Sequence, residues 1–177
     1  MKINILFLTI HILLFSLLSC SNDKDKEMVV PDGELYVIMN LYTLDGDIPT
    51  SNILFSIDDI KSFDTTTNEI IFYDLTVEEL YKRIYEDDYH SLTLYIGKVP
   101  ILDSINIRTV YSSDIYNSLA FVVLQDGCYL LDGYPSVDVT GDKKEEYQKI
   151  REENALKIKD KWKVFIKYME NRGKIVK

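Results

Sequence analysis

The sequence predicts an α+β fold, in which a mostly antiparallel sheet of about six to seven strands carries one short internal helix and a long C-terminal amphipathic helix packed on it. Short apolar segments follow one another between turn signals, as in a chain of strands. Only one short helical pattern interrupts them, so hairpin connections outnumber the strand–helix–strand units that build parallel sheets. A long helical pattern then closes the chain.

Seven segments have the composition or the alternation of strands. They are residues 34–42, 52–57, 69–73, 91–96, 105–111, 119–124 and 128–131. The alternation is clearest in residues 91–96, where Leu92, Leu94 and Ile96 are expected to face inward. Asp126-Gly127 lies between the last two segments and predicts a tight hairpin in which both of these residues have a positive φ.

The short internal helix is expected from Thr76 to about Asp87. Thr76 and Glu79 have the spacing of a capping box. In that motif the hydroxyl accepts a free backbone N–H of the first turn, and the carboxylate three residues later accepts the N–H of the capping residue.

The long helix is expected to begin at Asp142, with Glu145 as its capping-box partner, and to end at Gly173. Its apolar face includes Trp162 and Phe165, and this face should be buried across the sheet because the rest of the helix is too polar to be stable alone. Arg151 falls within the same face. We expect its guanidinium to reach solvent or to meet a carboxylate at the edge of the sheet.

Composition and charge exclude several classes of protein. The chain has 177 residues, of which 46% are hydrophobic, a mixture typical of a globular domain rather than of disorder. Twenty basic residues against 29 acidic ones give a net charge of −9, which argues against a nucleic-acid-binding domain. Residues 143–177 nevertheless carry a net charge of +6, because they hold twelve basic and six acidic residues. The simplest interpretation is a basic helix lying on an acidic body.

The first twenty residues have the layout of a secretory signal peptide. Lys2 provides a positive start, and the segment from Ile3 to Leu18 is almost entirely apolar. This segment is shorter than the roughly 20 apolar residues that a comfortable membrane span needs. The alternatives to a lipoprotein signal are an ordinary cleaved signal peptide and a buried N-terminal helix.

Leu17-Leu18-Ser19-Cys20 resembles the lipobox of bacterial lipoproteins, which places an aliphatic residue three positions before the cysteine and a small residue directly before it. The resemblance implies that residues 1–19 are removed and that the thiol of Cys20 carries a diacylglycerol group, whose acyl chains include fatty acids such as palmitate. Ser21 implies sorting to the outer membrane, as a lipid-anchored protein of its periplasmic face or of the cell surface. Beyond this signal, the domain resembles the uncharacterised small lipoproteins of Bacteroidetes.

The mature chain is expected to consist of a flexible tether, residues 20–33, and a single α+β domain, residues 34–177. The tether is polar and partly acidic from Ser21 to Glu27, a composition that does not fold alone. Pro31-Asp32-Gly33 is a turn signal that marks the start of the folded part.

Few residues suggest chemistry. His90 is the one histidine that remains after removal of the signal peptide, so sites that need two histidines are excluded, and it is interpreted as an exposed loop residue. Cys128 is the one remaining free thiol and is interpreted as a small buried residue. No catalytic residue, metal ligand or cofactor site is predicted. The alternative is an envelope hydrolase that uses Cys128 with His90, or a pair of carboxylates.

Tyrosine is abundant, with thirteen residues in the chain. Some of these side chains could form an aromatic binding surface for a protein or a glycan. The other interpretation is that tyrosine simply suits half-buried strand positions. The candidates for the surface are Tyr36, Tyr42, Tyr95, Tyr111, Tyr129 and Tyr134. The sequence thus predicts a membrane-anchored lipoprotein with a non-catalytic binding domain, whose partner is an envelope protein or a glycan and not a nucleic acid.

Overall fold

The computed structural model describes residues 28–41, 53–85, 89–109 and 114–177. The expected signal peptide, Cys20 and most of the expected tether lie outside these residues. The strands are β1 (Leu35–Leu41), β2 (Ile53–Ser56), β3 (Ile60–Asp64), β4 (Glu69–Phe72), β5 (Tyr89–Ile96), β6 (Val99–Thr109), β7 (Ala120–Leu124), β8 (Gly127–Leu131) and β9 (Ile175–Val176). The helices are α2 (Val77–Tyr85) and α3 (Lys144–Asn171), with the short 3-10 helices η2 (Val137–Val139) and η3 (Gly141–Lys143) before α3.

The nine strands form one sheet in the order β2-β1-β5-β6-β7-β8-β4-β3-β9. The α+β class and the mostly antiparallel pairing are confirmed, since β6–β7 and β3–β9 are the two parallel pairs among the strands described. The predicted number of six to seven strands was too low, because β3 and β9 were missed. β3 has the sequence Ile-Lys-Ser-Phe-Asp, which shows no alternation, and β9 has two residues.

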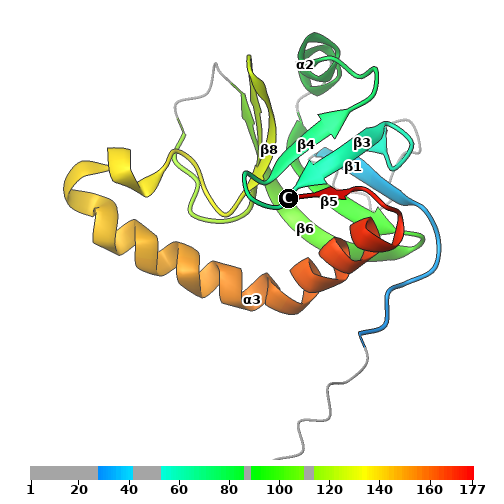
Figure 1. Ribbon diagram of the computed structural model, residues 1–177. Helices are drawn as coiled ribbons and strands as arrows, with labels where there is room; N and C mark the ends of the chain where they lie inside the picture. Colours follow the sequence, from blue (N-terminus) through cyan, green and yellow to red (C-terminus); the bar gives the residue numbers. More distant parts are fainter. Residues whose placement is uncertain (1–27, 42–52, 86–88, 110–113) are drawn as a thin grey trace, which may run out of the picture.

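The sheet curls because β2 and β3, which follow each other directly in the chain, pair with strands that are far apart in the strand order. Residues 57–59 alone separate β2 from β3, yet β2 pairs with β1 and β3 pairs with β4, far along the strand order. At this bend, Ile57 donates its N–H to Leu35 O (2.8 Å), and Tyr73 donates its N–H to Asp59 O (2.9 Å). β1 and β4 therefore lie on either side of the bend, and Figure 1 shows the resulting curved sheet.

The core fills the concave side of this curved sheet. Alternate residues of β1 and β5 face inward, as expected for Leu92, Leu94 and Ile96. α2 adds Leu80 and Ile84, and the C-terminal part of α3 adds Phe165 and Met169. Burial of such side chains contributes roughly 1.5–3 kcal/mol each, so the two helices are held mainly by these few residues.

The capping box of α2 is confirmed. Glu79 donates its N–H to the Thr76 hydroxyl (3.2 Å), and Thr76 donates its N–H to the Glu79 carboxylate (2.9 Å). The two hydrogen bonds that the Glu79 carboxylate accepts, from the Thr76 N–H and from the Thr76 hydroxyl, lower the pKa of Glu79.

The hairpin between β7 and β8 is confirmed, but its turn lies one residue earlier than predicted. Leu124 pairs with Gly127, so Gln125 and Asp126 form the loop. Neither Asp126 nor Gly127 has a positive φ. The prediction of two left-handed residues at Asp126-Gly127 was therefore wrong, since Gly127 already belongs to β8.

The long helix also begins later than predicted. Its N-cap is Lys143, which makes no side-chain capping bond, so the predicted Asp142–Glu145 capping box was wrong. Gly141 has φ of +64°, and residues 141–143 form η3 instead of the first helical turn. The C-terminus follows the prediction: Gly173 has φ of +65°, its N–H reaches Glu170 O, and the Lys174 N–H reaches Met169 O, which is a Schellman motif.

Candidate functional site: the groove beneath the long helix

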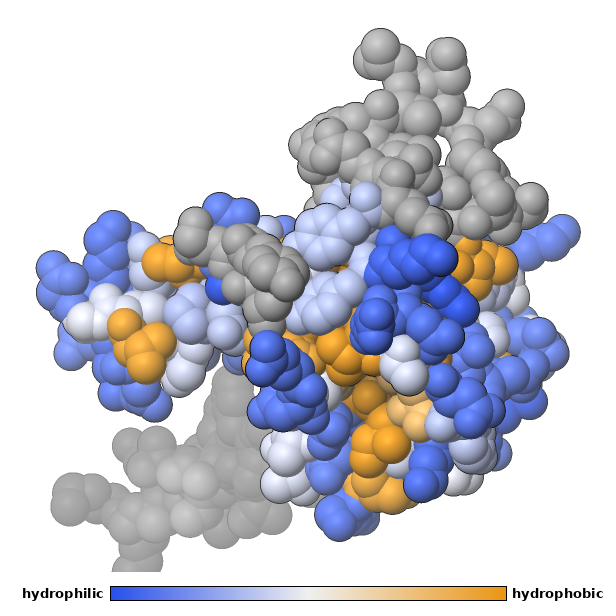
Figure 2. Space-filling model, turned by 90° about the horizontal axis from the view of Figure 1, so that it is seen from above, coloured by the Kyte–Doolittle hydropathy of each residue, from blue (hydrophilic) through white to orange (hydrophobic). Residues whose placement is uncertain are grey.

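α3 packs on the sheet at its C-terminal end and stands away from the sheet toward its N-terminal end. Phe165, Tyr168 and Met169 are buried, and Phe165 meets Phe63 of β3 edge to face at 5.2 Å. The Tyr168 hydroxyl donates to Gly33 O (3.1 Å) and accepts the Leu35 N–H (3.0 Å), which fixes this end of the helix to β1. Toward its N-terminus the helix extends beyond the sheet (Figure 1), and the space-filling view shows this end as a mostly hydrophilic projection (Figure 2).

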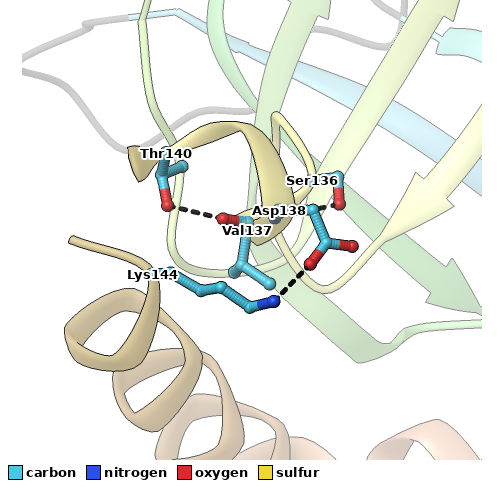
Figure 3. A network of polar contacts seen from close by, with 5 residues as sticks. All are labelled: Ser136, Val137, Asp138, Thr140 and Lys144. Atoms are coloured by element: carbon cyan, nitrogen blue, oxygen red, sulfur yellow. Dashed lines mark hydrogen bonds and ion pairs between the residues drawn. The ribbon is translucent and has the colours of Figure 1, made fainter. Parts of the chain in front are cut away.

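The projecting end is connected back to the sheet through the two 3-10 helices. Lys144, the first residue of α3, pairs with Asp138 of η2 at 2.6 Å (Figure 3). The Thr140 hydroxyl donates to Val137 O (2.7 Å), and the Ser136 hydroxyl accepts the Asp138 N–H (3.3 Å). The Asp138–Lys144 hydrogen bond lowers the pKa of the aspartate and raises the pKa of the lysine. Both groups are exposed, so this pair orients the end of the helix more than it stabilises the fold.

A hollow remains between α3 and the sheet beneath the middle of the helix. Two cavities, of about 490 and 300 Å³, lie between α3 and the sheet and share Leu119, Asp132, Ala155 and Ile158. We call this feature the helix groove and define it by six residues: Leu119, Leu130, Asp132, Ala155, Ile158 and Trp162. Leu119 and Leu130 form an apolar floor, while Ile158 and Trp162 project from the helix.

Charged side chains surround the apolar floor. Lys159 and Lys163 lie at the larger opening, and Asp103 and Lys157 lie at the smaller one. Asp103 is already paired with Lys161 at 2.7 Å. Lys159 has no hydrogen bond or ion pair with the residues that the structure describes. A groove with an apolar floor and a charged rim is typical of a binding site for an amphipathic segment or a small organic molecule.

A third hollow, of about 380 Å³, adjoins the groove at Asp132 and contains a buried arginine. Arg151 of α3 is 4% exposed. Its Nε donates to the Asn117 side-chain oxygen (3.1 Å), and Asn154, one turn along the helix, donates to the Asn117 backbone oxygen (2.7 Å). Asn117 is held in turn by the bridge between Tyr116 and Tyr134.

The structure corrects one expectation for Arg151. The side chain is 4% exposed and bonds to no carboxylate among the described residues, and its Nη2 is buried with no hydrogen-bond partner. Burial lowers the pKa of this guanidinium, and the charge of Asp132 opposes the shift. The helical period places Arg151 on the apolar face, but it gives no indication that the backbone of Gly133 and the side chain of Asn117 would enclose it.

None of the four tyrosine candidates that the structure describes lines the helix groove. Tyr36 and Tyr95 are cross-strand partners on β1 and β5, with rings stacked at 5.4 Å and 7°. Tyr129 lies on β8, which β6 and β7 separate from β5, and Tyr134 follows β8 and lines the Arg151 hollow. Tyr42 and Tyr111 lie outside the described residues.

The proposed nucleophile of the alternative function lies in the core. Cys128 is 3% exposed and belongs to the main hydrophobic cluster. Burial raises the pKa of its thiol to about 12, so the group is protonated at neutral pH. His90 lies in β5, so its predicted place in a loop was wrong, and its side chain is outside the described part of the structure. A protonated, shielded thiol is a structural residue rather than a nucleophile.

Two further features are absent from the described ranges. No cluster of three or more histidine, cysteine, aspartate or glutamate residues there is arranged to hold a metal ion. Within the same ranges, no helix combines the length and the apolar composition required to cross a membrane. No protein-family model matches the chain, and no match is found among curated proteins or solved structures.

Proposed function

We propose that this protein is a lipid-anchored protein of the cell envelope whose domain binds a partner in the helix groove and does no catalysis. The observation that carries the binding role is the groove itself. A hollow lies beneath the 28-residue helix, and its apolar floor consists of Leu119 and Leu130, which are 8% and 3% exposed. Closing that space with larger side chains would stabilise the fold, so its presence favours a ligand.

The anchoring role rests on the resemblance of Leu17-Leu18-Ser19-Cys20 to a lipobox. Two or three acyl chains on Cys20 hold a protein firmly at a bilayer, since each buried methylene contributes roughly 0.8 kcal/mol. Outer-membrane attachment follows from the same resemblance through Ser21. The partner we favour is an envelope protein or a glycan.

The alternative of an envelope hydrolase is less well supported. Its cysteine form needs an accessible thiolate, and the Cys128 thiol is buried with a pKa of about 12. A hydrolase that uses two carboxylates would need two unpaired acids facing each other in a cleft. The helix groove holds Asp132, and Asp103 at the smaller opening is paired with Lys161.

Anchoring is tested by comparing Cys20→Ala with Ser19→Ala in the native host. Cys20→Ala removes the acceptor thiol, so we expect no labelling with a fatty-acid analogue and loss of the protein from the detergent phase. Ser19→Ala keeps a small residue before the cysteine and should be labelled like the wild type. Equal labelling and equal partitioning of the two variants would refute the anchor.

Groove binding is tested by placing a photo-crosslinking amino acid at Ala155 or at its neighbour Leu156. Ala155 lines the groove, whereas Leu156 is 68% exposed and does not line it. Irradiation of cells should give a discrete adduct from position 155 and none from position 156. The absence of an adduct at 155, or the same adduct from both positions, would show that the groove is not the binding site.

A further inference from the structure

Among the described residues, the guanidinium of Arg151 is hydrogen-bonded through Nε alone, and its two terminal nitrogens are without partners. Its Nε is used by Asn117, while Nη1 and Nη2 make no hydrogen bond with any residue that the structure describes. Those two nitrogens form the end of the planar fork, which binds a carboxylate through two parallel hydrogen bonds. Nη2 is buried without an acceptor, which is costly in the folded chain because a buried donor without an acceptor loses its bonds to water.

The fork is held in a fixed position. The side chain lies so close to Gly133 that a Cβ at that residue would be 2.4 Å from Nε and 2.6 Å from Cζ. Asn117 fixes the other side of the guanidinium through Nε. Preorganisation of this kind lowers the entropy that an arginine loses when it binds an acid.

The hollow around Arg151 is large enough for more than an inorganic ion. It measures about 380 Å³, and apart from Arg151 its lining is contributed by Leu131, Tyr134, Val137 and a few polar residues. The polar groups include the Ser136 hydroxyl and the Gln148 side chain. Asp132 also lies here, but it makes no hydrogen bond with Arg151 and leaves the fork open.

We infer that the hollow between Leu131–Val137 and the N-terminal half of α3 binds an organic carboxylate, with Arg151 as a bidentate anchor and the apolar residues against the body of the ligand. This inference rests on the proposed function, because it names the ligand chemistry at one end of the helix groove. The acid could belong to a small molecule or to the end of a larger partner, and both present the same group to Arg151.

The test uses the full chain purified in detergent, with sodium benzoate as the probe and benzamide as its neutral analogue of the same shape. Calorimetry should show binding of benzoate and binding of benzamide weaker by roughly tenfold or more, since two charge-assisted hydrogen bonds are lost. Benzoate should also shift the Nε–Hε resonance of Arg151 in nitrogen–proton spectra. Equal binding of the two probes, or no binding of either, would overturn the inference.

Variants identify the residue. Arg151→Lys keeps the charge but has no fork, and it should lose at least roughly tenfold in benzoate affinity. Lys149→Gln removes an exposed cation from the same helix and should leave binding unchanged. Inorganic phosphate is the third probe, and phosphate binding without benzoate binding would show that the site is not selective for organic acids and would refute the assignment. If Arg151→Lys fails to fold, the resonance shift in the wild-type protein decides.

The benzoate experiment and the crosslinking experiment can fail independently of each other. Crosslinking from Ala155 with no benzoate binding would leave groove binding intact and reject the carboxylate. Benzoate binding at Arg151 with no crosslinking from Ala155 would support the carboxylate site and reject the partner in the groove.

Discussion

The guanidinium of Arg151 lies against the backbone of Gly133, with no room for a side chain between them. A Cβ on Gly133 would come within 2.4 Å of the arginine Nε and within 2.7 Å of Tyr116 O. One neighbour is a buried charged group and the other is backbone, so neither can move without disturbing the hydrogen bonds around Asn117. This contact explains why a glycine follows Asp132 directly after β8.

Gly133→Ala should therefore displace Arg151 and destabilise the fold by about 1–3 kcal/mol, the usual cost of overpacking. Urea denaturation provides the measurement. Gly127→Ala is the matched control: its Cβ would meet the Glu69 carboxylate at 2.8 Å and the Tyr129 hydroxyl at 3.0 Å, and both are the ends of side chains that can turn away. If the two variants lose the same stability, the contact between Arg151 and Gly133 is not the cause of the destabilisation by Gly133→Ala.

Phe165→Ala should be among the most damaging substitutions in α3. The ring is 1% exposed and packs on Phe63, so its loss should cost about 3–5 kcal/mol. Leu156→Ala on the same helix should change stability by less than about 0.5 kcal/mol, since Leu156 is 68% exposed. Thermal unfolding of both variants gives the comparison, and similar melting temperatures would contradict a major role of Phe165 in packing the helix on the sheet.

Thr76→Ala should cost about 1 kcal/mol, because it removes the N-cap of α2. Chemical denaturation at neutral pH measures this loss. Replacement of Thr76 by serine keeps the hydroxyl and should restore most of the stability; a serine variant as weak as the alanine variant would exclude capping as the cause.

Glu79 makes the same cap dependent on pH. Its pKa is lower in the folded chain than in the unfolded one, so its contribution is present above the unfolded pKa and is lost as the pH falls through the folded pKa. Glu79→Gln should be less stable than the wild type at neutral pH, and the difference should vanish in acid. Denaturation curves at several pH values test this, and a difference that is constant with pH would contradict it.

Cys128 should be inert in the native protein. Its thiol is buried and its pKa is about 12, so an aromatic disulfide reagent should react with it only after unfolding. Cys20→Ala leaves Cys128 as the chain's one cysteine and is the background for the measurement. Rapid reaction without denaturant would instead indicate an accessible thiol and revive the hydrolase alternative.

Local patterns in the sequence predicted the elements that depend on local contacts. The Thr76–Glu79 capping box, the β7–β8 hairpin and the glycine after α3 each need residues a few positions apart. β3 depends instead on pairing with β4 and β9, and the apolar pattern of its own five residues is weak. The start of α3 was misplaced because the left-handed Gly141 starts a 3-10 turn that no capping rule anticipates.

The candidate site could be predicted only in part, because it too depends on contacts between residues that are far apart in the sequence. The sequence places Arg151 and Trp162 on the apolar face of one helix. The groove, however, depends on where distant residues hold that helix: Gly33 near its C-terminal end, and Asn117 and Asp138 in its N-terminal half. The stacking of Tyr36 on Tyr95 likewise depends on the register between β1 and β5. Such long-range geometry leaves no local trace in the sequence.

The strands at the two ends of the sheet are short: β2 has four residues and β9 has two. Unpaired strand edges are the template on which identical molecules join and aggregate, and short edges offer few backbone groups for this. Molecules crowded side by side on a lipid surface would meet one another far more often than in dilute solution. The short edge strands β2 and β9 would limit edge-to-edge pairing of neighbouring molecules under such crowding.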